Sequence, residues 1–518
     1  GQSAQSYRAY GINASAQNVP NTSEGDMYLT LGNVDGRQVS DYGDLSTIAS
    51  YFGRVNYSFK NRYMVNASLR ADGSSKFAGT NRWGYFPSVG LGWVVSEEDF
   101  MKDQKIFDNL KFRASWGKVG NASVPANVSV LRVNQAANLT AIFGDQIYTG
   151  ASINSVVPPT TFWERSVGTD VGIEMAFLKN KLTFEADYYS RKTEMAIFDI
   201  PIPSSIGTGS STITGNQADI QNRGYEFVLN YRNTISKDLS FSIGGNIGIN
   251  DNKVLRVVTG ANPIYSGGAA STGGALATRT IEGQPIGQFF GYIVDGIFQN
   301  TTEVAASAQK NAKPGDFKYR DISGPDGRPD GVISDLDRAP LGNPNPKFSY
   351  GINTNWNYKQ FDLMLDFQGV AGVDIYNANL GLRYGNENFT KDFYNNRWHG
   401  EGTSNTYPSV NIGGGDNYRP NSFFVESGAY FRVRNIQLGY SLPSTLTDKL
   451  HIKKLRVFAN AQNALNFFKY RGFTPEVTGA YNSSGAATSG TSATINAGID
   501  TNVYPMYATY NFGLNVTF

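Results

Sequence analysis

Closely spaced carboxylates in residues 326–337 are the side chains whose spacing most clearly suggests chemistry, namely the binding of a metal ion. The sequence there reads D-G-R-P-D-G-V-I-S-D-L-D. Calcium takes about six to eight hard oxygen ligands, which carboxylates around a glycine-permitted turn can supply. Arg328 stands where the D-x-[DN]-x-D-G pattern expects Asn or Asp, so a degenerate loop held by Asp–Arg pairing is the competing interpretation. The first ligands expected for Ca2+, in a role that stiffens a loop, are Asp326, Asp330 and Asp337, with Asp335 or backbone carbonyls completing the shell.

Few residues are available for catalysis. The sequence has two histidines and no cysteine, which removes thiol, iron–sulfur and zinc-finger chemistry and leaves little for a histidine acid–base centre. Neither His399 nor His451 has an obvious serine or cysteine partner in the sequence. The net charge is +2, with 45 basic and 43 acidic residues and no basic block, so the chain lacks the electrostatic footprint of a nucleic-acid-binding protein. We expect no enzyme and no nucleic-acid partner.

Apolar and polar residues alternate with a period of two in segment after segment. From Leu182 the letters L-T-F-E-A-D-Y-Y place apolar side chains on one face, with Thr183, Glu185 and Asp187 on the other. The pattern predicts about thirteen strands of roughly the ten residues that a tilted strand needs to span a bilayer. These segments, together with a weaker strand at 7–13, are 51–59, 62–70, 87–95, 110–117, 169–178, 182–189, 225–232, 239–249, 347–357, 361–368, 429–440, 453–461 and 507–518.

The connections between these segments alternate between short and long. A barrel of the bacterial outer membrane has short periplasmic turns and long outer loops, whereas a soluble sandwich has no reason to separate loop lengths in this way. No run approaches the ~18 uncharged apolar residues of a membrane helix, so the helical membrane class is excluded. We therefore expect an all-β, transmembrane antiparallel β-barrel in the outer membrane, in contact with its lipid. The long extracellular loops expected are 71–86, 118–168, 191–222, 250–346, 370–428 and 462–506.

The last predicted strand alternates up to an aromatic C-terminal residue. Such an end is similar to the signal that the barrel-assembly machinery of the outer membrane recognises, although any final strand of a β protein also alternates. The expected assembly signal consists of Tyr510, Phe512, Leu514, Val516 and Phe518.

Several motifs resemble those of the SusC/RagA family of TonB-dependent outer-membrane transporters, and they occur in family order over nearly the whole chain. The matching runs are N-R-W-G-Y-F-P-S-V-G-L-G-W (81–93), L-K-F-R-A-S-W-G-K-V-G-N (110–121), W-E-R-S-V-G-T-D-V-G-I-E (163–174), N-R-G-Y-E-F (222–227), P-I-G-Q-F-F-G-Y (285–292), G-N-P-N-P-K-F-S-Y-G (342–351), F-R-V-R-N-I-Q-L-G-Y-S-L-P (431–443) and N-A-L-N-F-F (463–468).

The resemblance implies a barrel of about 22 strands that is occluded by an N-terminal plug. It also implies a SusD-like surface lipoprotein that closes over the mouth, and TonB acting on the plug to release cargo inward. No plug, TonB-contacting segment or small periplasmic domain is expected in these residues, so residues 1–518 are interpreted as the C-terminal part of the barrel, with the plug absent from this chain. An open sheet of this size would leave two unpaired edges in lipid, which is costly.

The function expected from the resemblance is TonB-dependent active import of oligosaccharides or oligopeptides. A surface interaction or adhesion protein with a barrel anchor and a passive porin are the alternatives, and an upstream plug with a TonB-contacting segment would distinguish the importer. The acidic residues on strand faces are expected to face the lumen. Loop aromatics that could stack on cargo, or instead pack loop against loop, are Phe289, Phe290, Tyr292, Tyr394 and Trp398.

Overall fold

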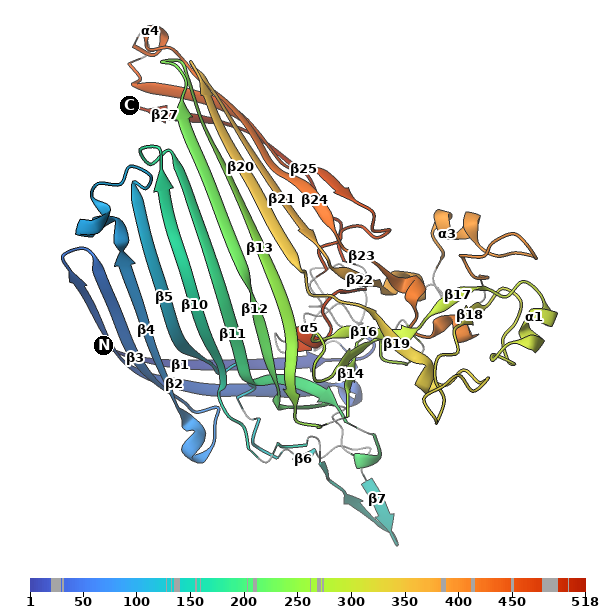
Figure 1. Ribbon diagram of the computed structural model, residues 1–518. Coiled ribbons are helices and arrows are strands. Elements are labelled where there is room, and N and C mark those ends of the chain that lie inside the picture. The colour runs from blue at the N-terminus through green and yellow to red at the C-terminus, as the bar shows by residue number, and fades with distance from the viewer. Residues whose placement is uncertain are drawn as a thin grey trace.

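The main body of the molecule is one antiparallel sheet of 14 strands (Figure 1). The computed structural model describes the chain except for residues 20–28, 30–31, 127, 132, 135–139, 154–155, 159, 203, 208–211, 261, 268–271, 273, 383–387, 411–414, 449–450, 478–491 and 502. In sheet order the strands are β1 (Gln2–Ser15), β2 (Gln38–Phe59), β3 (Tyr63–Ser74), β4 (Trp83–Val94), β5 (Asn109–Asn121), β10 (Glu164–Phe177), β11 (Leu182–Pro201), β12 (Thr212–Thr234), β13 (Leu239–Val257), β20 (Phe348–Tyr358), β21 (Phe361–Ala371), β24 (Tyr430–Ser441), β25 (Lys454–Phe468) and β27 (Thr509–Thr517).

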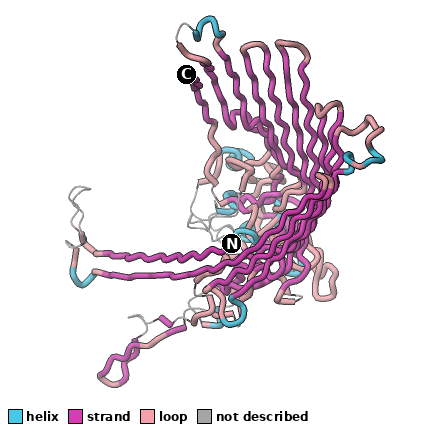
Figure 2. The backbone as a smooth tube through the Cα atoms, turned by 90° about the vertical axis from the view of Figure 1, so that its left-hand side faces the viewer, coloured by secondary structure: helices cyan, strands magenta, loops and turns pink. Residues whose placement is uncertain are grey.

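Every strand predicted from alternation, including the weaker one at 7–13, is present in this sheet. Each strand pairs with its neighbour along the chain through a short turn or across a longer connection. The turn between β2 and β3 is tight because Lys60 and Asn61 both adopt positive φ, at 52° and 56°. The β1–β2 hairpin projects away from the remaining strands (Figure 2).

Many strands run further than the alternation predicted, and the extension of four of them shortens two of the expected loops. β11 has 20 residues and β12 has 23, so their connection shrinks from the expected 191–222 to 202–211. Likewise β3 and β4 leave only residues 75–82 of the expected loop 71–86. The long loops expected at these two places are therefore wrong. Met195, at a φ of 57°, forms an irregularity in β11 beyond which pairing resumes, and Ile197 and Phe198 are buried there.

The two faces of the main sheet differ in chemistry, as the alternation predicted. On one, Phe184 stacks on Phe227 with ring centroids 6.3 Å apart, and the exposed rings of Tyr188 and Tyr225 lie 5.4 Å apart. We call this the apolar face. The opposite face, which carries Glu174, Asp187 and Asp366, is the polar face. An exposed apolar face on a sheet of this size suits contact with lipid.

Residues of the long connections 258–347, 372–429 and 469–508 fold against one another into what we call the loop layer, at the right of Figure 1. Its strands form small sheets: β14 (Ile264–Ser266), β15 (Thr278–Thr280), β16 (Gln288–Tyr292) and β19 (Arg338–Gly342); β17 (Val294–Ile297) with β18 (Phe317–Tyr319); and β23 (Val425–Ser427), β22 (Asp374–Asn377) and β26 (Ile499–Asp500). The core of the layer includes the fully buried Phe289, Tyr376, Phe393 and Phe424. Long-range packing thus orders the described residues of these connections.

The remaining elements are short. Connection 122–163 contains β6 (Val133–Asn134) with β9 (Ser152–Ile153), and β7 (Thr140–Phe143) with β8 (Gln146–Thr149). The α-helices are α1 (Thr301–Ala306), α2 (Ala378–Leu382), α3 (Lys391–Asn396), α4 (Ser444–Thr447) and α5 (Ser492–Ile495). Within the described residues, no helix has the length and apolar character to cross a membrane.

Candidate functional site

The polar face carries a network of ion pairs across β5, β10 and β11. Lys111 Nζ lies 3.0 Å from Glu174 Oε1, and Arg113 Nε lies 3.1 Å from the same oxygen. Arg113 also reaches Asp170, at 3.2 Å, and Asp187, at 2.5 Å. These carboxylates lie on the face opposite the aromatic rings, where the alternation placed them. Charges in such a network neutralise one another and are held in fixed positions.

Glycines allow one of these ion pairs, and a second one between β25 and β21, to cross an intervening strand. Gly172 of β10 lies directly between Arg113 and Asp187 in the strand register. A Cβ at this position would stand 1.9 Å from Asp187 Oδ1, so a side chain would occupy the space that the ion pair uses. Gly439 of β24 plays the same part for the ion pair between Arg456 and Asp362, whose Nε and Oδ1 are 2.8 Å apart.

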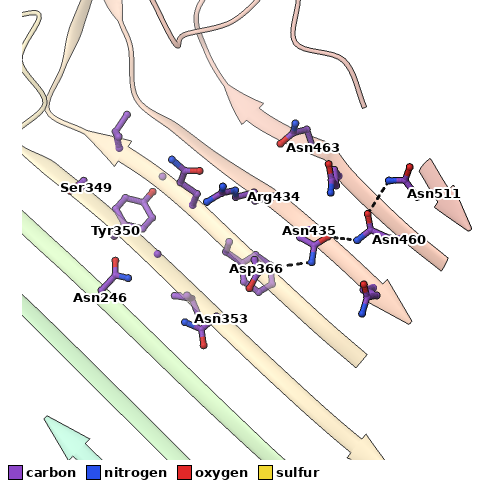
Figure 3. A pocket seen from close by; sticks show the side chains of 18 of the residues that line it. Asn246, Ser349, Tyr350, Asn353, Asp366, Arg434, Asn435, Asn460, Asn463 and Asn511 are labelled. Atoms are coloured by element: carbon purple, nitrogen blue, oxygen red, sulfur yellow. Dashed lines mark hydrogen bonds between the residues drawn. The ribbon is translucent and has the colours of Figure 1, made fainter. Parts of the chain in front are cut away.

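A polar cavity of about 1110 Å³ lies on the polar face of the C-terminal strands (Figure 3). Its lining comes from β13, β20, β21, β24, β25 and β27. A ladder of hydrogen bonds crosses its floor: Asn435 donates to Asp366 at 3.3 Å, Asn460 donates to Asn435, and Asn511 donates to Asn460 at 3.3 Å. Carboxamides both donate and accept, so this surface can bind hydroxyls, amides and carboxylates.

Two successive irregularities in strand pairing shape the upper part of this cavity. Val433 and Asn435 of β24 pair with two consecutive residues of β21, so β24 has one extra residue there. The same two residues pair with Leu465 and Gln462 of β25, so β25 has one residue more than β24. The extra residue of β24 is Arg434, which is exposed and lines the cavity. Asn463 of β25 lies in the same region with a φ of 53° and also lines the cavity. Bulges often occur next to functional sites because they redirect a side chain.

The pairing of Arg434 differs from that of two other arginines of β24 and β25. Arg432 lies 2.8 Å from Glu476, and Arg456 pairs with Asp362. Among the residues that the structure describes, Arg434 makes no hydrogen bond or ion pair. Its guanidinium therefore carries a charge that no described group of the chain neutralises.

Most of the loop aromatics expected to contact cargo are packed inside the loop layer. Phe289 is 0% exposed, and Tyr292 stacks on Tyr319 with ring centroids 4.9 Å apart. Phe290 is buried under the guanidinium of Arg279, 3.9 Å from its ring centroid.

Tyr394 and Trp398 are more accessible. Tyr394 is 55% exposed and lies under Arg397, and half-buried Trp398 donates from Nε1 to Gln299 at 3.2 Å. The structure thus gives all five aromatics packing contacts, and a role in cargo binding stays a prediction.

The candidate calcium ligands do not converge. In the part of the chain that the structure describes, no group of three or more His, Cys, Asp or Glu residues is placed to hold a metal ion. Asp335 accepts a hydrogen bond from the hydroxyl of Tyr292 at 3.1 Å, and Asp330 accepts from the N–H of Val332 at 3.0 Å. Asp326 lies exposed in the turn before them. Calcium binding by residues 326–337 stays a prediction.

Asp337 has a structural role in this segment. It is fully buried at the end of the 3-10 helix Asp335–Asp337 and accepts backbone N–H groups of Ile322, Ser323 and Ser334 at 2.8, 3.1 and 2.8 Å. Burial raises the pKa of its carboxyl, but the backbone donors Ser334, Ile322 and Ser323 together lower that pKa below its ordinary value. The carboxylate of Asp337 therefore connects the start of the segment, at residues 322–323, to its end, at residues 334–337.

The two histidines and the final strand lie where the sequence suggested. Exposed His399 has its Nδ1 3.0 Å from the carbonyl oxygen of Arg397, and exposed His451 lies in the connection between β24 and β25. In β27 the exposed large apolar side chains share the apolar face: Tyr510, Phe512, Leu514 and Val516, with Phe518 following. Recognition of this end by the assembly machinery stays a prediction.

The family of the chain follows from its match to a family model. The model described as "TonB dependent receptor-like, beta-barrel" matches residues 1–464. The chain belongs to this family. The TonB-dependent receptor P3 of Formosa agariphila is 32% identical over 487 residues, which cover 93% of this chain and 46% of that protein. The TonB-dependent receptor SusC of Bacteroides thetaiotaomicron is 28% identical over 496 residues, covering 93% of this chain and 45% of that protein.

Solved structures show the same fold. The RagAB peptide transporter matches with a TM-score of 0.76 at 21% identity, over 96% of this chain and 50% of that one. The RagAB peptide importer in its closed-closed state matches with a TM-score of 0.77 at 21% identity, over 100% of this chain and 53% of that one. The chain spans about half the length of the curated relatives it matches. The resemblance to SusC/RagA is confirmed, and the chain is part of an outer-membrane β-barrel.

The alternation pattern did not predict the cavity residues, although the sequence contains one sign of the bulge at the cavity. In F-R-V-R-N-I-Q-L-G-Y the apolar positions are Phe431 and Val433, then Ile436, Leu438 and Tyr440, so their parity changes after Val433. Both groups can share the apolar face only if one residue is extra. That change of parity points to the bulge at Arg434.

Proposed function

We propose that these residues form the C-terminal barrel part of a TonB-dependent importer of oligosaccharides or oligopeptides. The observation that carries the proposal is the match of residues 1–464 to the TonB-dependent receptor barrel family. The polar cavity on the inner side of the proposed barrel supports it, because carboxamide groups suit both sugar hydroxyls and peptide amides.

The proposed partners are a SusD-like surface lipoprotein, which would close over the outer loops, and TonB, acting through a plug region of the complete protein. Relatives support the pairing: one is named SusC, and the solved RagAB structures are titled as a peptide transporter and importer. The ordered loop layer offers a preformed surface on which a lipoprotein could dock. Deletion of residues 391–410 from the loop layer should weaken recovery of the lipoprotein with the purified transporter.

The test is uptake by living cells that carry the full-length gene, a deletion, or the gene with TonB depleted. Labelled pools of oligosaccharides and oligopeptides are supplied, and periplasmic accumulation is measured. An importer gives accumulation above the external concentration that requires both the gene and TonB. Uptake that continues to equilibrium without TonB indicates a porin, and surface retention without uptake indicates an adhesion protein; either result contradicts the proposal.

A further inference from the structure

We propose that Arg434 is the anchor of a carboxylate-binding subsite in the polar cavity, so that the preferred cargo is a polar oligomer with a free carboxylate. This inference deepens the proposed function and rests on it. The carboxylate could belong to a uronic acid or to the C-terminus of a peptide.

The first argument is the charge that Arg434 leaves unpaired. A guanidinium stays protonated at every physiological pH and presents planar donors that match the two oxygens of a carboxylate. On the same two strands, β24 and β25, Arg456 uses this geometry on Asp362, and Arg432 pairs through one guanidinium nitrogen with Glu476. Asp366, the acidic residue of the cavity, accepts a hydrogen bond from Asn435 and makes no ion pair with Arg434.

The second argument is the backbone that presents Arg434. The residue is extra relative to β21, and Asn463 in the facing part of β25 adopts a left-handed φ of 53°. Asparagine adopts this conformation more readily than most non-glycine residues, and Asn463 does so in the irregular stretch of β25 that faces Arg434. Two local irregularities thus coincide beside one unpaired cation, at the wall of the cavity (Figure 3).

The third argument is the lining around the guanidinium. Asn463 and Gln462 of β25 line the same cavity as Arg434. Their carboxamides can donate to carboxylate oxygens and accept from hydroxyls or amides of the remaining oligomer. A carboxylate at Arg434 with neutral polar groups along the asparagine ladder is the ligand that this lining complements.

The experiment uses the complete transporter, extracted from outer membranes with its partners, and compares ligand retention by wild type, Arg434→Gln and Arg434→Lys. Two pools are used as probes: random tetra- to octapeptides with free C-termini, and oligogalacturonates. Each has a neutral partner pool, the C-terminal amides and the methyl esters. Bound molecules are quantified by mass spectrometry after washing. Arg54→Gln is the matched control, because Arg54 is an exposed arginine of β2 whose one hydrogen bond to a described side chain is to Asn56.

Wild type should retain at least one free-acid pool over its neutral partner, and the pool retained identifies the source of the carboxylate. Arg434→Gln should reduce that retention about ten- to hundredfold and leave the neutral pool unchanged, while Arg434→Lys should fall between them. Raising the salt concentration should weaken acid retention in wild type but not in Arg434→Gln. Arg54→Gln should behave as wild type.

Equal retention of acids by wild type and folded Arg434→Gln, or no preference for either free-acid pool, would overturn the inference. Loss of stability in Arg434→Gln with unchanged ligand selectivity would also overturn it, since that result assigns Arg434 to pairing within the complete protein. The outcomes for the proposed function are distinct from these. Retention of acids without TonB-dependent uptake would support the subsite and contradict the importer. TonB-dependent uptake with no preference for acids would support the importer and contradict the subsite.

Discussion

Gly172→Ala should destabilise the barrel because it removes the space through which Arg113 reaches Asp187. The new Cβ would stand 1.9 Å from Asp187 Oδ1 and 3.1 Å from Arg113 Cζ, so the ion pair of 2.5 Å cannot persist. A hydrogen bond to a charged partner contributes about 1.5–3 kcal/mol. The Arg113 side chain is 33% exposed and keeps its contacts to other carboxylates, so screening places the loss near the lower end, at about 1.5–2 kcal/mol.

Gly168→Ala on the same strand is the matched control, because nothing lies within 4 Å of a Cβ there. Both changes alter strand propensity alike, so their difference isolates the ion pair. The complete protein is unfolded with urea in detergent, and the folded fraction is followed by gel mobility before and after heating. Asp187→Asn is then added to each background, and it should cost less in the Gly172→Ala variant, where the pair is already broken. Equal unfolding midpoints for the two alanine variants would refute the reasoning.

Four further predictions concern the loops and the C-terminus. Because the folded-state pKa of Asp337 is lowered, its contribution to stability is complete above the ordinary pKa of a free carboxyl and is lost as the pH falls through the lowered value. Cleavage by pepsin within residues 315–340 should therefore rise over that acidic range. A cleavage rate that does not change with pH would contradict this prediction. Chelation of calcium should loosen the same loop without affecting the barrel, and unchanged protease sensitivity would remove the calcium prediction. Phe424→Ala, at a fully buried position, should lower the stability of the loop layer by about 3–5 kcal/mol. Amide hydrogen exchange should then become faster in β22 while β12 stays protected. Equally faster exchange in both strands would argue against a separate core in the loop layer. Removal of Phe518 should lower the amount of heat-modifiable barrel in outer membranes, and an unchanged yield would remove the assembly-signal prediction.

The main sheet was predictable because its signal is local. Alternation such as that from Leu182 to Tyr188 reports the two environments of a strand directly, whatever its neighbours are. The ends of β11 were not predictable, since its pairing continues past an irregularity at Met195 that depends on β12. Strand continuation beyond the amphipathic stretch is set by partners distant in sequence.

The loop aromatics illustrate a second limit. Phe289 and Tyr394 are both aromatic residues of long connections, yet the first is fully buried and the second is 55% exposed. The difference arises from packing against Tyr376 and Phe424, which belong to another connection. No period within a single loop encodes such contacts. The bulge at Arg434 could have been predicted from the sequence, because the apolar positions change parity after Val433 and this change requires an extra residue.

The parallel pairing of β22 with β26 has a consequence for the order of folding. Tyr376 pairs with Ile499, more than a hundred residues later and just before the final strand. Because contacts distant in sequence form late, the loop layer cannot close until the end of the chain has been delivered. We expect this part of the loop layer to become ordered only after β26 has been delivered, which would keep immature barrels from displaying a finished outer surface.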